Sequence, residues 1–354
     1  MNLREDHWSE GAARVATRHG LREPSFELAA EAYTDAVGGD ISGSSMRRVT
    51  QGFGKRVAEA KKEEAERAMA IGPFGESPRE RRIALKDPIE GVGNVSSDGT
   101  MILVRGEGWK EVKLATFSRV EVLEVDSEKR RRWQREGKRG QEKIVRLSEH
   151  SYCAGLWDAD TFGPYQYAEG LRRGFDQLEQ QSSVNDGALW IERITGMNFP
   201  QATQIVDWSH SMGRLWAVAN ALYGEGQPDA AGWVKRREDE LWQGEVEQVI
   251  RELDSHKLDR RSYPDLVRQA PGYFTNNRKR MRYHSFRAAG YPIGSGTVES
   301  GARNVVQPRM RRPGRGWKRE NAQAMLAALG ELHSGRFQWV WQQVYCLAAS
   351  PPKF

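Results

Sequence analysis

The sequence predicts an α/β fold in which hairpin-linked strands come before the first crossover helix. Residues 91–125 are rich in Val, Leu, Ile, Thr and Phe and are broken by "GEG", which is typical of two or three antiparallel strands. "IVRLSEHSYCAGLW" (144–157) predicts a further strand, and residues 158–178 predict a helix. Strands in "SSVNDGALWIERI" and "QIVDW" then alternate with helices, and this order of elements is typical of an α/β protein.

Composition narrows the class of protein. The chain has 354 residues, enough for two or three domains, and its charged content of 29% and mean hydropathy of −0.73 predict a soluble protein. No apolar run is long enough to span a bilayer, and the N-terminus lacks the apolar segment of a secretory signal. Cys153 and Cys346 form no motif, which favours a reducing compartment over a disulfide framework or a zinc ribbon. We therefore expect a cytoplasmic protein with no membrane partner.

Residues 1–88 are predicted to form a small helical N-terminal domain. Residues 25–37 space their apolar side chains along one helix face, and Gly38 ends that helix. A serine in residues 42–44 caps a second helix, and a third passes through residues 57–70. Short helices beside a basic "MRRV" fit a helix-turn-helix DNA reader, and they fit a helical bundle or dimerisation segment equally well.

Two basic segments each have a structural and a functional interpretation. Residues 126–143 are predicted to be an exposed insertion, or a finger that contacts phosphates. Residues 224–289 are predicted to be mainly helical, and their basic end, "YFTNNRKRMRYHSFR", interleaves aromatic and cationic side chains. It either stacks bases and holds phosphates or is an exposed helix packed by its aromatics. The cations expected to contact DNA there are Arg278, Lys279, Arg280 and Arg282.

Acidic residues mark the ends of several predicted elements. Asp98 lies in the first strand, Asp186 follows a later strand, and Glu299 lies on a predicted helix. Asp207 and His210 are a further pair, in "DWSH". Taken singly, each acid is typical of a turn or of a helix N-terminus. Three acids on separate elements, two of them at strand ends, instead predict a divalent-cation site for phosphoryl transfer.

The chemistry of phosphodiester cleavage explains this set of residues. Two Mg²⁺ ions roughly 3.5–4 Å apart activate the attacking oxygen and stabilise the leaving oxygen, and Mn²⁺ can replace them. These hard cations prefer carboxylate ligands, and no His/Cys cluster has zinc spacing. Glu299 stands in a field of cations, so the acid would hold a metal while its neighbours hold DNA phosphates. The neighbours expected to bind DNA are Arg303, Arg309, Arg311, Arg312, Arg315 and Lys318.

The chain resembles the DDE transposases of bacterial insertion sequences, in particular the Kra-type family related to the mutator-like group. The resemblance rests on "SSDGTMILVRG", on "VNDGALWIERITGMNFPQATQIVDWSHSMGRLW" and most specifically on "YPIGSGTVESGARNVVQPRMRRPGRGWKRENAQAMLAAL", and it covers most of residues 90–330. It implies an RNase H-like mixed-sheet catalytic domain over residues 89–350, with a helical insertion at about 224–290. Longer relatives carry cysteines in an N-terminal segment, and the chain departs from them in that residues 1–90 contain no cysteine.

The resemblance also implies roles for particular residues. Asp98, Asp186 and Glu299 would be the catalytic acids and the ligands of two Mg²⁺ or Mn²⁺ ions, and Asp207 and His210 would be auxiliary. Water would hydrolyse a strand at each element end, and the freed 3′-hydroxyl would attack target DNA. The partners would be double-stranded DNA at the element ends and target site, and a second copy in a dimeric or larger synaptic complex near the bacterial nucleoid.

Two other functions remain open from the sequence. One is an RNase H-like nuclease that hydrolyses DNA without strand transfer, and the block "GSGTVESGARN" argues against it. The other is a non-catalytic DNA-binding repressor derived from a transposase. That reading needs a lost acid, and all three acids are present.

Overall fold

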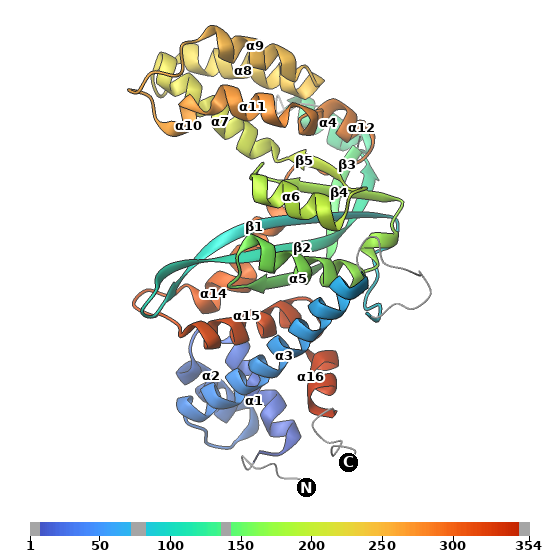
Figure 1. Cartoon of the computed structure of the whole chain (residues 1–354), viewed down its shortest axis with the longest axis vertical. Coiled ribbons are helices and arrows are strands. Elements are labelled where there is room, and N and C mark those ends of the chain that lie inside the picture. Colours follow the sequence, from blue (N-terminus) through green and yellow to red (C-terminus); the bar gives the residue numbers. More distant parts are fainter. Residues whose placement is uncertain (1–7, 72–82, 136–142, 347–354) are drawn as a thin grey trace.

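The protein is built around a five-stranded mixed sheet with strand order β3-β2-β1-β4-β5 (Figure 1). The computed structural model describes residues 8–71, 83–135 and 143–346. The three antiparallel strands come first in the chain, and β4 and β5 then extend the sheet parallel to β1. The strands are β1 (Val92–Val104), β2 (Gly108–Glu124), β3 (Lys143–Gly155), β4 (Gln180–Asn185) and β5 (Thr203–Val206). The predicted α/β class and the predicted strands are confirmed.

Strands β1 and β2 form a long hairpin that closes on the predicted glycine turn. Val104 pairs with Gly108, and Gly106 and Gly108 both have a φ of 78°, a left-handed conformation that glycine adopts without strain. Helix α5 (Ala159–Arg172) then crosses from β3 to β4, as expected from residues 158–178. Pairing of β1 with both β2 and β4 places Asp98 in the middle of the sheet.

Two segments differ from the sequence-based expectation. The predicted strand at 182–194 ends at Asn185, and helix α6 (Leu189–Asn198) follows because Ile191 and Ile194 bury one helical face. The two helices expected between 42 and 70 are one helix, α3 (Gly43–Ile71).

Helix α3 stays continuous because one apolar face runs along its N-terminal half. Met46, Val49, Phe53 and Val57 recur every three or four residues and are all buried. Gly54 lies inside this helix, where a Cβ would stand 2.5 Å from the carbonyl oxygen of a residue in α15 (Arg319–His333). Glycine therefore permits the close approach of the two helices rather than breaking α3.

The N-terminal helices do not have a core of their own. α1 (Glu10–Arg22), α2 (Phe26–Val37) and α3 pack with α15 and α16 (Phe337–Cys346) in one apolar cluster. That cluster includes Ile102, Val104 and Leu114 from the β1–β2 hairpin. The predicted helical character of residues 1–88 is confirmed where the structure describes it, but these helices share their core with the C-terminal part of the chain.

The other face of the sheet is covered by α5, α6 and the short helix η1 (Phe175–Gln177). Their core is aromatic: Phe117 of β2 makes edge-on contacts with Phe175 and Phe199, at centroid distances of 5.3 and 5.8 Å. Ala65 and Ala68, near the C-terminal end of α3, also pack into this core. Helix α3 therefore contributes to the cores on both sides of the sheet.

The segment expected to be mainly helical forms the end of the molecule opposite the two termini (Figure 1). Its helices bury Trp233, Leu241, Phe274 and Tyr283 together with Val206 of β5. The helices are α7 (Trp208–Tyr223), α8 (Pro228–Gln243), α9 (Val246–Ser255), α10 (Asp265–Arg268), α11 (Ala270–Asn277), η2 (Arg278–Arg280) and α12 (Tyr283–Ala288).

The charged segment at 126–143 is only partly described. Its first part is helix α4 (Ser127–Arg135) rather than a loop, and residues 136–142 lie outside the described residues. Across the described part of the chain, no helix combines the length and the apolar character that crossing a membrane requires.

A buried network of six charged side chains joins α3, α5 and α15. The Arg336 guanidinium donates to both oxygens of Glu169, at 2.8 and 2.9 Å, and to Glu331 at 2.8 Å. Arg172 donates to Glu331 at 2.9 Å and also to Glu64, and Lys61 lies 2.5 Å from Glu331. Three cations face three carboxylates, so the network is electrically balanced although Glu169, Glu331 and Arg336 are almost wholly buried.

We predict that Arg336→Met destabilises the protein by about 3–5 kcal/mol, because it leaves two buried glutamates short of a cation. The measurement is the urea midpoint at neutral pH. The control is Arg319→Met, which removes an exposed ion pair with Glu107 and should cost about 1 kcal/mol or less. Equal losses for the two variants would contradict the importance of the network.

Acid is predicted to weaken the same network. Burial by itself raises the pKa of Glu331, but Arg336, Lys61 and Arg172 outweigh it and hold the pKa well below the ordinary value. As the pH falls, Glu331 therefore takes up a proton in the unfolded chain before it does so in the folded protein. The stabilisation is complete above the unfolded pKa of about 4.3 and is lost as the pH falls through the lower folded-state pKa.

Urea midpoints measured from neutral pH downward test this. Glu331→Gln should be less stable than wild type at neutral pH and should lose less stability on acidification. A variant whose pH dependence parallels that of wild type would show that Glu331 titrates normally in the folded protein.

Candidate active site

The pairing of β1 with β4 brings the first two predicted acids level with each other. β4 runs parallel to β1 with Val95 opposite Ser183, so the same register sets Asp98 opposite Asp186, just past the end of β4. The buried Asn185 side chain fixes this junction by accepting a 2.7 Å hydrogen bond from the backbone N–H of Ser97. Asp186 accepts a 2.8 Å hydrogen bond from the backbone of Ala188, which shapes the turn after β4.

Asp207 joins the next strand end to the segment that leads to Glu299. It follows β5, caps α7 and accepts hydrogen bonds from the His210 backbone at 2.9 Å and from the Ser295 backbone. Its side chain is 1% exposed. Burial alone raises the pKa of Asp207, but the hydrogen bonds from His210 and Ser295 outweigh it and hold the pKa far below the ordinary value.

His210 is held by the same carboxylate. Its Nδ1 lies 3.2 Å from Asp207 Oδ1, while 46% of the side chain stays exposed. The hydrogen bond with Asp207 raises the pKa of His210 against the opposing effect of burial, and the negative charges of Asp207, Asp186 and Glu299 raise it further. His210 therefore faces the acids as a group that gains a proton easily.

Glu299 reaches the sheet on a short helix. α13 (Gly296–Gly301) packs against β1 and β2, where a Cβ on Gly301 would stand 3.0 Å from Tyr152 and 3.1 Å from Thr116. The helix continues into a π-helical turn, η3 (Ala302–Val306), and then α14 (Gln307–Met310). π-Helical turns are frequent at functional sites.

The three predicted acids interact through their charges. Burial raises the pKa of Asp98, and the charges of Asp186 and Glu299 raise it further, against a hydrogen bond from Gly99 and the His210 ring. In the described residues no group of three or more His, Cys, Asp or Glu side chains is arranged so that it could hold a metal ion. The acids therefore gather around one site without standing together at coordination distance.

Sequence reasoning missed three residues that support this site. The Tyr273 hydroxyl donates to the Asp186 carbonyl at 2.9 Å, so it holds the turn after β4 rather than stacking a base. Arg214 lies over the Tyr273 ring at 3.8 Å, and Ser295 binds Asp207. Of the three, only Arg214 could have been found from the sequence, because it follows Asp207 by seven residues, which is two helical turns along one face.

The predicted DNA-binding cations divide into exposed and buried groups. Arg309 is 4% exposed and donates to the carbonyls of Gly20 and Pro24 at 3.1 and 3.2 Å, and its guanidinium lies over the Phe26 ring. Burial lowers the pKa of Arg309 to about 10. Arg280 is also buried and pairs with Glu192 at 2.9 Å. The exposed members are Arg278, Lys279, Arg282, Arg303, Arg311, Arg312, Arg315 and Lys318.

The basic segment at 273–287 packs largely as a structural element. Phe274, Tyr283 and Phe286 lie in the core of the helical segment, so they are not available for base stacking. Arg282 is exposed and pairs with Glu247 at 2.5 Å. Of the two interpretations of this segment, packing by its aromatic side chains describes it correctly.

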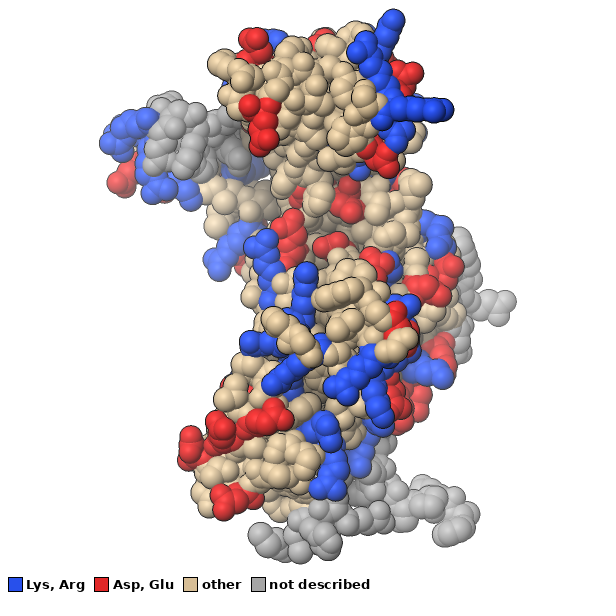
Figure 2. Space-filling view, turned by 90° about the vertical axis from the view of Figure 1, so that its left-hand side faces the viewer, with Lys and Arg blue, Asp and Glu red and all other residues tan. Residues whose placement is uncertain are grey.

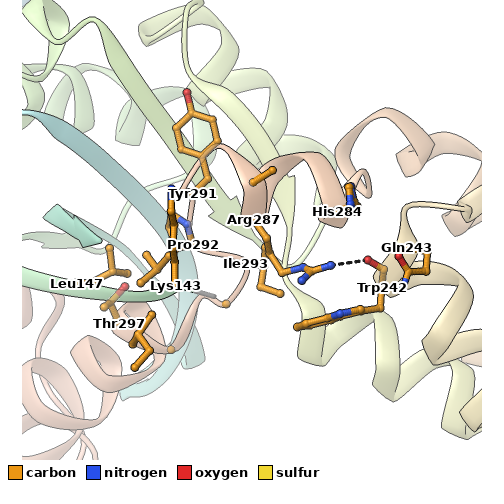
Figure 3. A pocket seen from close by; sticks show the side chains of 15 residues that line it. Lys143, Leu147, Trp242, Gln243, His284, Arg287, Tyr291, Pro292, Ile293 and Thr297 are labelled. Carbon is orange, nitrogen blue, oxygen red and sulfur yellow. Dashed lines mark hydrogen bonds between the residues drawn. The ribbon is translucent and has the colours of Figure 1, made fainter. Parts of the chain in front are cut away.

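A cavity of about 820 Å³ adjoins the segment that leads into α13 (Figure 3). Lys143 and Leu147 of β3 line one side, and Ile293 and Thr297 border it next to Glu299. On the far side Arg287 lies 3.5 Å over the Trp242 ring and donates to its carbonyl at 2.7 Å. None of the residues predicted for the site lines this cavity among those the structure describes.

Comparison of the chain with models of known protein families finds no match, and comparison with curated proteins finds no match either.

We predict that Asp207→Asn lowers the pKa of His210, because it replaces the carboxylate, whose negative charge favours the imidazolium, with a neutral amide. An NMR titration of the His210 ring measures this. Glu252→Gln is the matched control, since Glu252 lies 3.3 Å from the ring of His256 and should leave His210 unchanged. If Asp207→Asn leaves the His210 titration in place, the two side chains are not coupled in solution.

Proposed function

We propose that this protein is a DDE-type DNA transposase of a bacterial insertion sequence. The observation that carries the proposal is the gathering of Asp98, Asp186 and Glu299 from β1, the end of β4 and α13 beside the pair formed by Asp207 and His210. Residues 88 and 113 positions apart in the chain come together in one site, as phosphoryl transfer requires.

The architecture supports an RNase H-like catalytic domain. A mixed sheet carries two of the acids, and a helical segment separates β5 from the helix that bears Glu299. This arrangement matches the helical insertion before the third acid that the family resemblance implies. The exposed arginines after Glu299 give the site a surface for DNA phosphates.

The chemistry of the three carboxylates suits Mg²⁺ or Mn²⁺, and they would have to move closer together when a metal binds, because in the described residues they do not stand at coordination distance. The ligands would be the carboxylates of Asp98, Asp186 and Glu299, and hard cations prefer such oxygens. Burial is the main cause of the raised pKa of Asp98, and the charges of Asp186 and Glu299 add to it, so a cation at this site would favour the ionised form. When bound, the metal ions would activate water or a 3′-hydroxyl and stabilise the leaving oxygen.

The protein's own groups would position the DNA. His210 offers an imidazole whose Nδ1 is held by Asp207, which leaves Nε2 for a phosphate oxygen. Arg303, one helical turn beyond Glu299 and exposed, would neutralise a neighbouring phosphate. Asp207, in contact with both His210 and Ser295, would fix the position of α13 relative to β5.

We predict that Glu299→Gln abolishes strand cleavage but keeps DNA binding. The change preserves size and removes the charge expected to hold a metal, so cleavage should fall by more than about 100-fold. The measurement is cleavage of a supercoiled plasmid carrying the flanking element ends, with Mg²⁺, beside a gel-shift assay without metal. Glu320→Gln is the control, since Glu320 also lies in the first turn of a helix beside the arginines.

The outcomes separate the candidate functions. Cleavage at the ends with joining to target DNA supports a transposase, whereas cleavage without joining supports a nuclease. Equal cleavage by wild type and Glu299→Gln would remove Glu299 from the site. Binding without cleavage by wild type would support a repressor.

A further inference from the structure

We propose that the tip of the β1–β2 hairpin and the adjoining loop extend the DNA-binding surface beside Glu299 to a point about six nucleotides from the acids. This extension, called the hairpin-tip surface, consists of Arg105, Trp109 and residues 311–318. Its distance from the reacting phosphate rests on the proposed function, whereas its affinity for duplex DNA does not.

The hairpin-tip surface combines exposed cations with an exposed aromatic ring. Trp109 is 55% exposed, and the Arg311 guanidinium lies 5.7 Å from its ring centroid. Leaving a large apolar ring in water is unfavourable, and tryptophan is enriched where proteins contact partners. The exposed cations of the surface are Arg105, Arg311, Arg312, Arg315 and Lys318.

The backbone holds the loop against the hairpin in a fixed position. Trp317 N–H donates to the Leu103 carbonyl at 2.9 Å, and Arg105 N–H donates to the Trp317 carbonyl at 2.8 Å. Arg105 Nε also donates to the Gly316 carbonyl at 2.6 Å, and the Trp317 ring donates to the Met310 carbonyl at 3.1 Å. The cations are thus arranged before any partner binds, which lowers the cost of binding.

The acids near the hairpin tip are already neutralised. Arg319 donates to both oxygens of Glu107, at 3.0 and 2.6 Å, and Lys110 lies 3.9 Å from the same carboxylate. Arg315 contributes to lowering the pKa of Glu27, after backbone and Ser25 hydrogen bonds. The remaining exposed arginines keep the surface positive. The hairpin tip projects on the left in Figure 1, the side that faces the viewer in Figure 2, where Lys and Arg gather across the middle of the molecule.

Two structural elements link this surface to the candidate active site. β1 runs from Asp98 to Val104, which spans about 20 Å at ~3.3 Å per residue. The helical run from Glu299 to Met310 covers a similar length, about 17 Å at ~1.5 Å per residue, and the chain after it pairs with Val104. Each strand of a duplex carries one phosphate per about 3.4 Å of helix axis, so a duplex whose axis runs along β1 would place the hairpin tip about six nucleotides from Asp98.

Duplex DNA fits this arrangement better than an acidic protein does. Arg303 is exposed one turn beyond Glu299, and Arg311, Arg312 and Arg315 are exposed where the chain approaches the hairpin tip, so exposed cations stand near both ends of that helical run. A DNA backbone presents evenly spaced negative charges that would meet both groups of cations. Trp109 at the hairpin tip would pack against the sugars of the same backbone.

The test is the salt dependence of DNA binding by the full chain. Binding is measured without metal through the fluorescence anisotropy of a fluorescein-labelled duplex. Each lost phosphate contact lowers the slope of log affinity against log salt by roughly 0.9. Arg312→Ala/Arg315→Ala should therefore lower the slope by about 2. Trp109→Ala should weaken binding about tenfold with the slope unchanged, because its contact is apolar. Arg236→Ala/Arg251→Ala, two exposed arginines of α8 and α9, is the control and should change neither.

The experiments distinguish failure of the hairpin-tip surface from failure of the proposed function. If Arg312→Ala/Arg315→Ala lowers the slope but Glu299→Gln still cleaves fully, the hairpin-tip surface is supported and the proposed catalytic site is wrong. An unchanged slope in Arg312→Ala/Arg315→Ala, or an equal fall in the control, overturns the hairpin-tip surface even if Glu299 proves catalytic. Equal binding of the wild-type chain to polyglutamate and to duplex would favour an acidic protein partner and also overturn it.

Discussion

The buried charge network is the constraint on which the layers of the molecule depend. α3 is the helix that enters the apolar cores on both sides of the sheet, and its Lys61 and Glu64 meet α5 and α15 in the network. Moving any one of the three helices would leave a buried charge unpaired, at a cost of several kcal/mol. Apolar packing alone tolerates small shifts more easily. The network therefore fixes the helices that cover the sheet, and through the sheet it fixes Asp98 within β1 and Asp186 just past the end of β4.

The candidate site depends on a second, smaller constraint at Asp207. This buried carboxylate binds the backbone of α7 at one end of the helical segment and the backbone of Ser295 at the other. The chain thus leaves the sheet and returns to it at one point, and the helices between need only form their own core. Such a closed insertion can be long without moving Glu299, because both of its ends are held by the same side chain.

Sequence patterns predicted the α/β class and where its strands lie, because strand patterns are local in the sequence. That Asp98, Asp186 and Glu299 form one catalytic site stays a prediction. Sequence patterns did not predict the charge network, in which the partners Lys61 and Glu331 lie 270 residues apart. They also failed to distinguish Arg309 from Arg311 and Arg312, since a run of arginines does not reveal which one faces the carbonyls of Gly20 and Pro24. They also did not show that residues 42–70 form one helix, since the carbonyl that packs against Gly54 belongs to a helix far away in the sequence.

The position of Glu299 among many arginines in the sequence has an electrostatic explanation. Burial raises the pKa of Asp98 and the charges of Asp186 and Glu299 raise it further, and three such carboxylates would repel a DNA backbone brought toward them alone. On the proposed function, the exposed arginines after Glu299 would lower that repulsion before the reacting phosphate arrives, whereas the buried Arg309 binds the N-terminal helices instead. The arginines and the acids would then have opposite roles in one surface: the arginines would attract the polyanion, and the acids, with a cation, would act on a single phosphate. A segment with the arginines but without Glu299 would bind DNA and leave it intact.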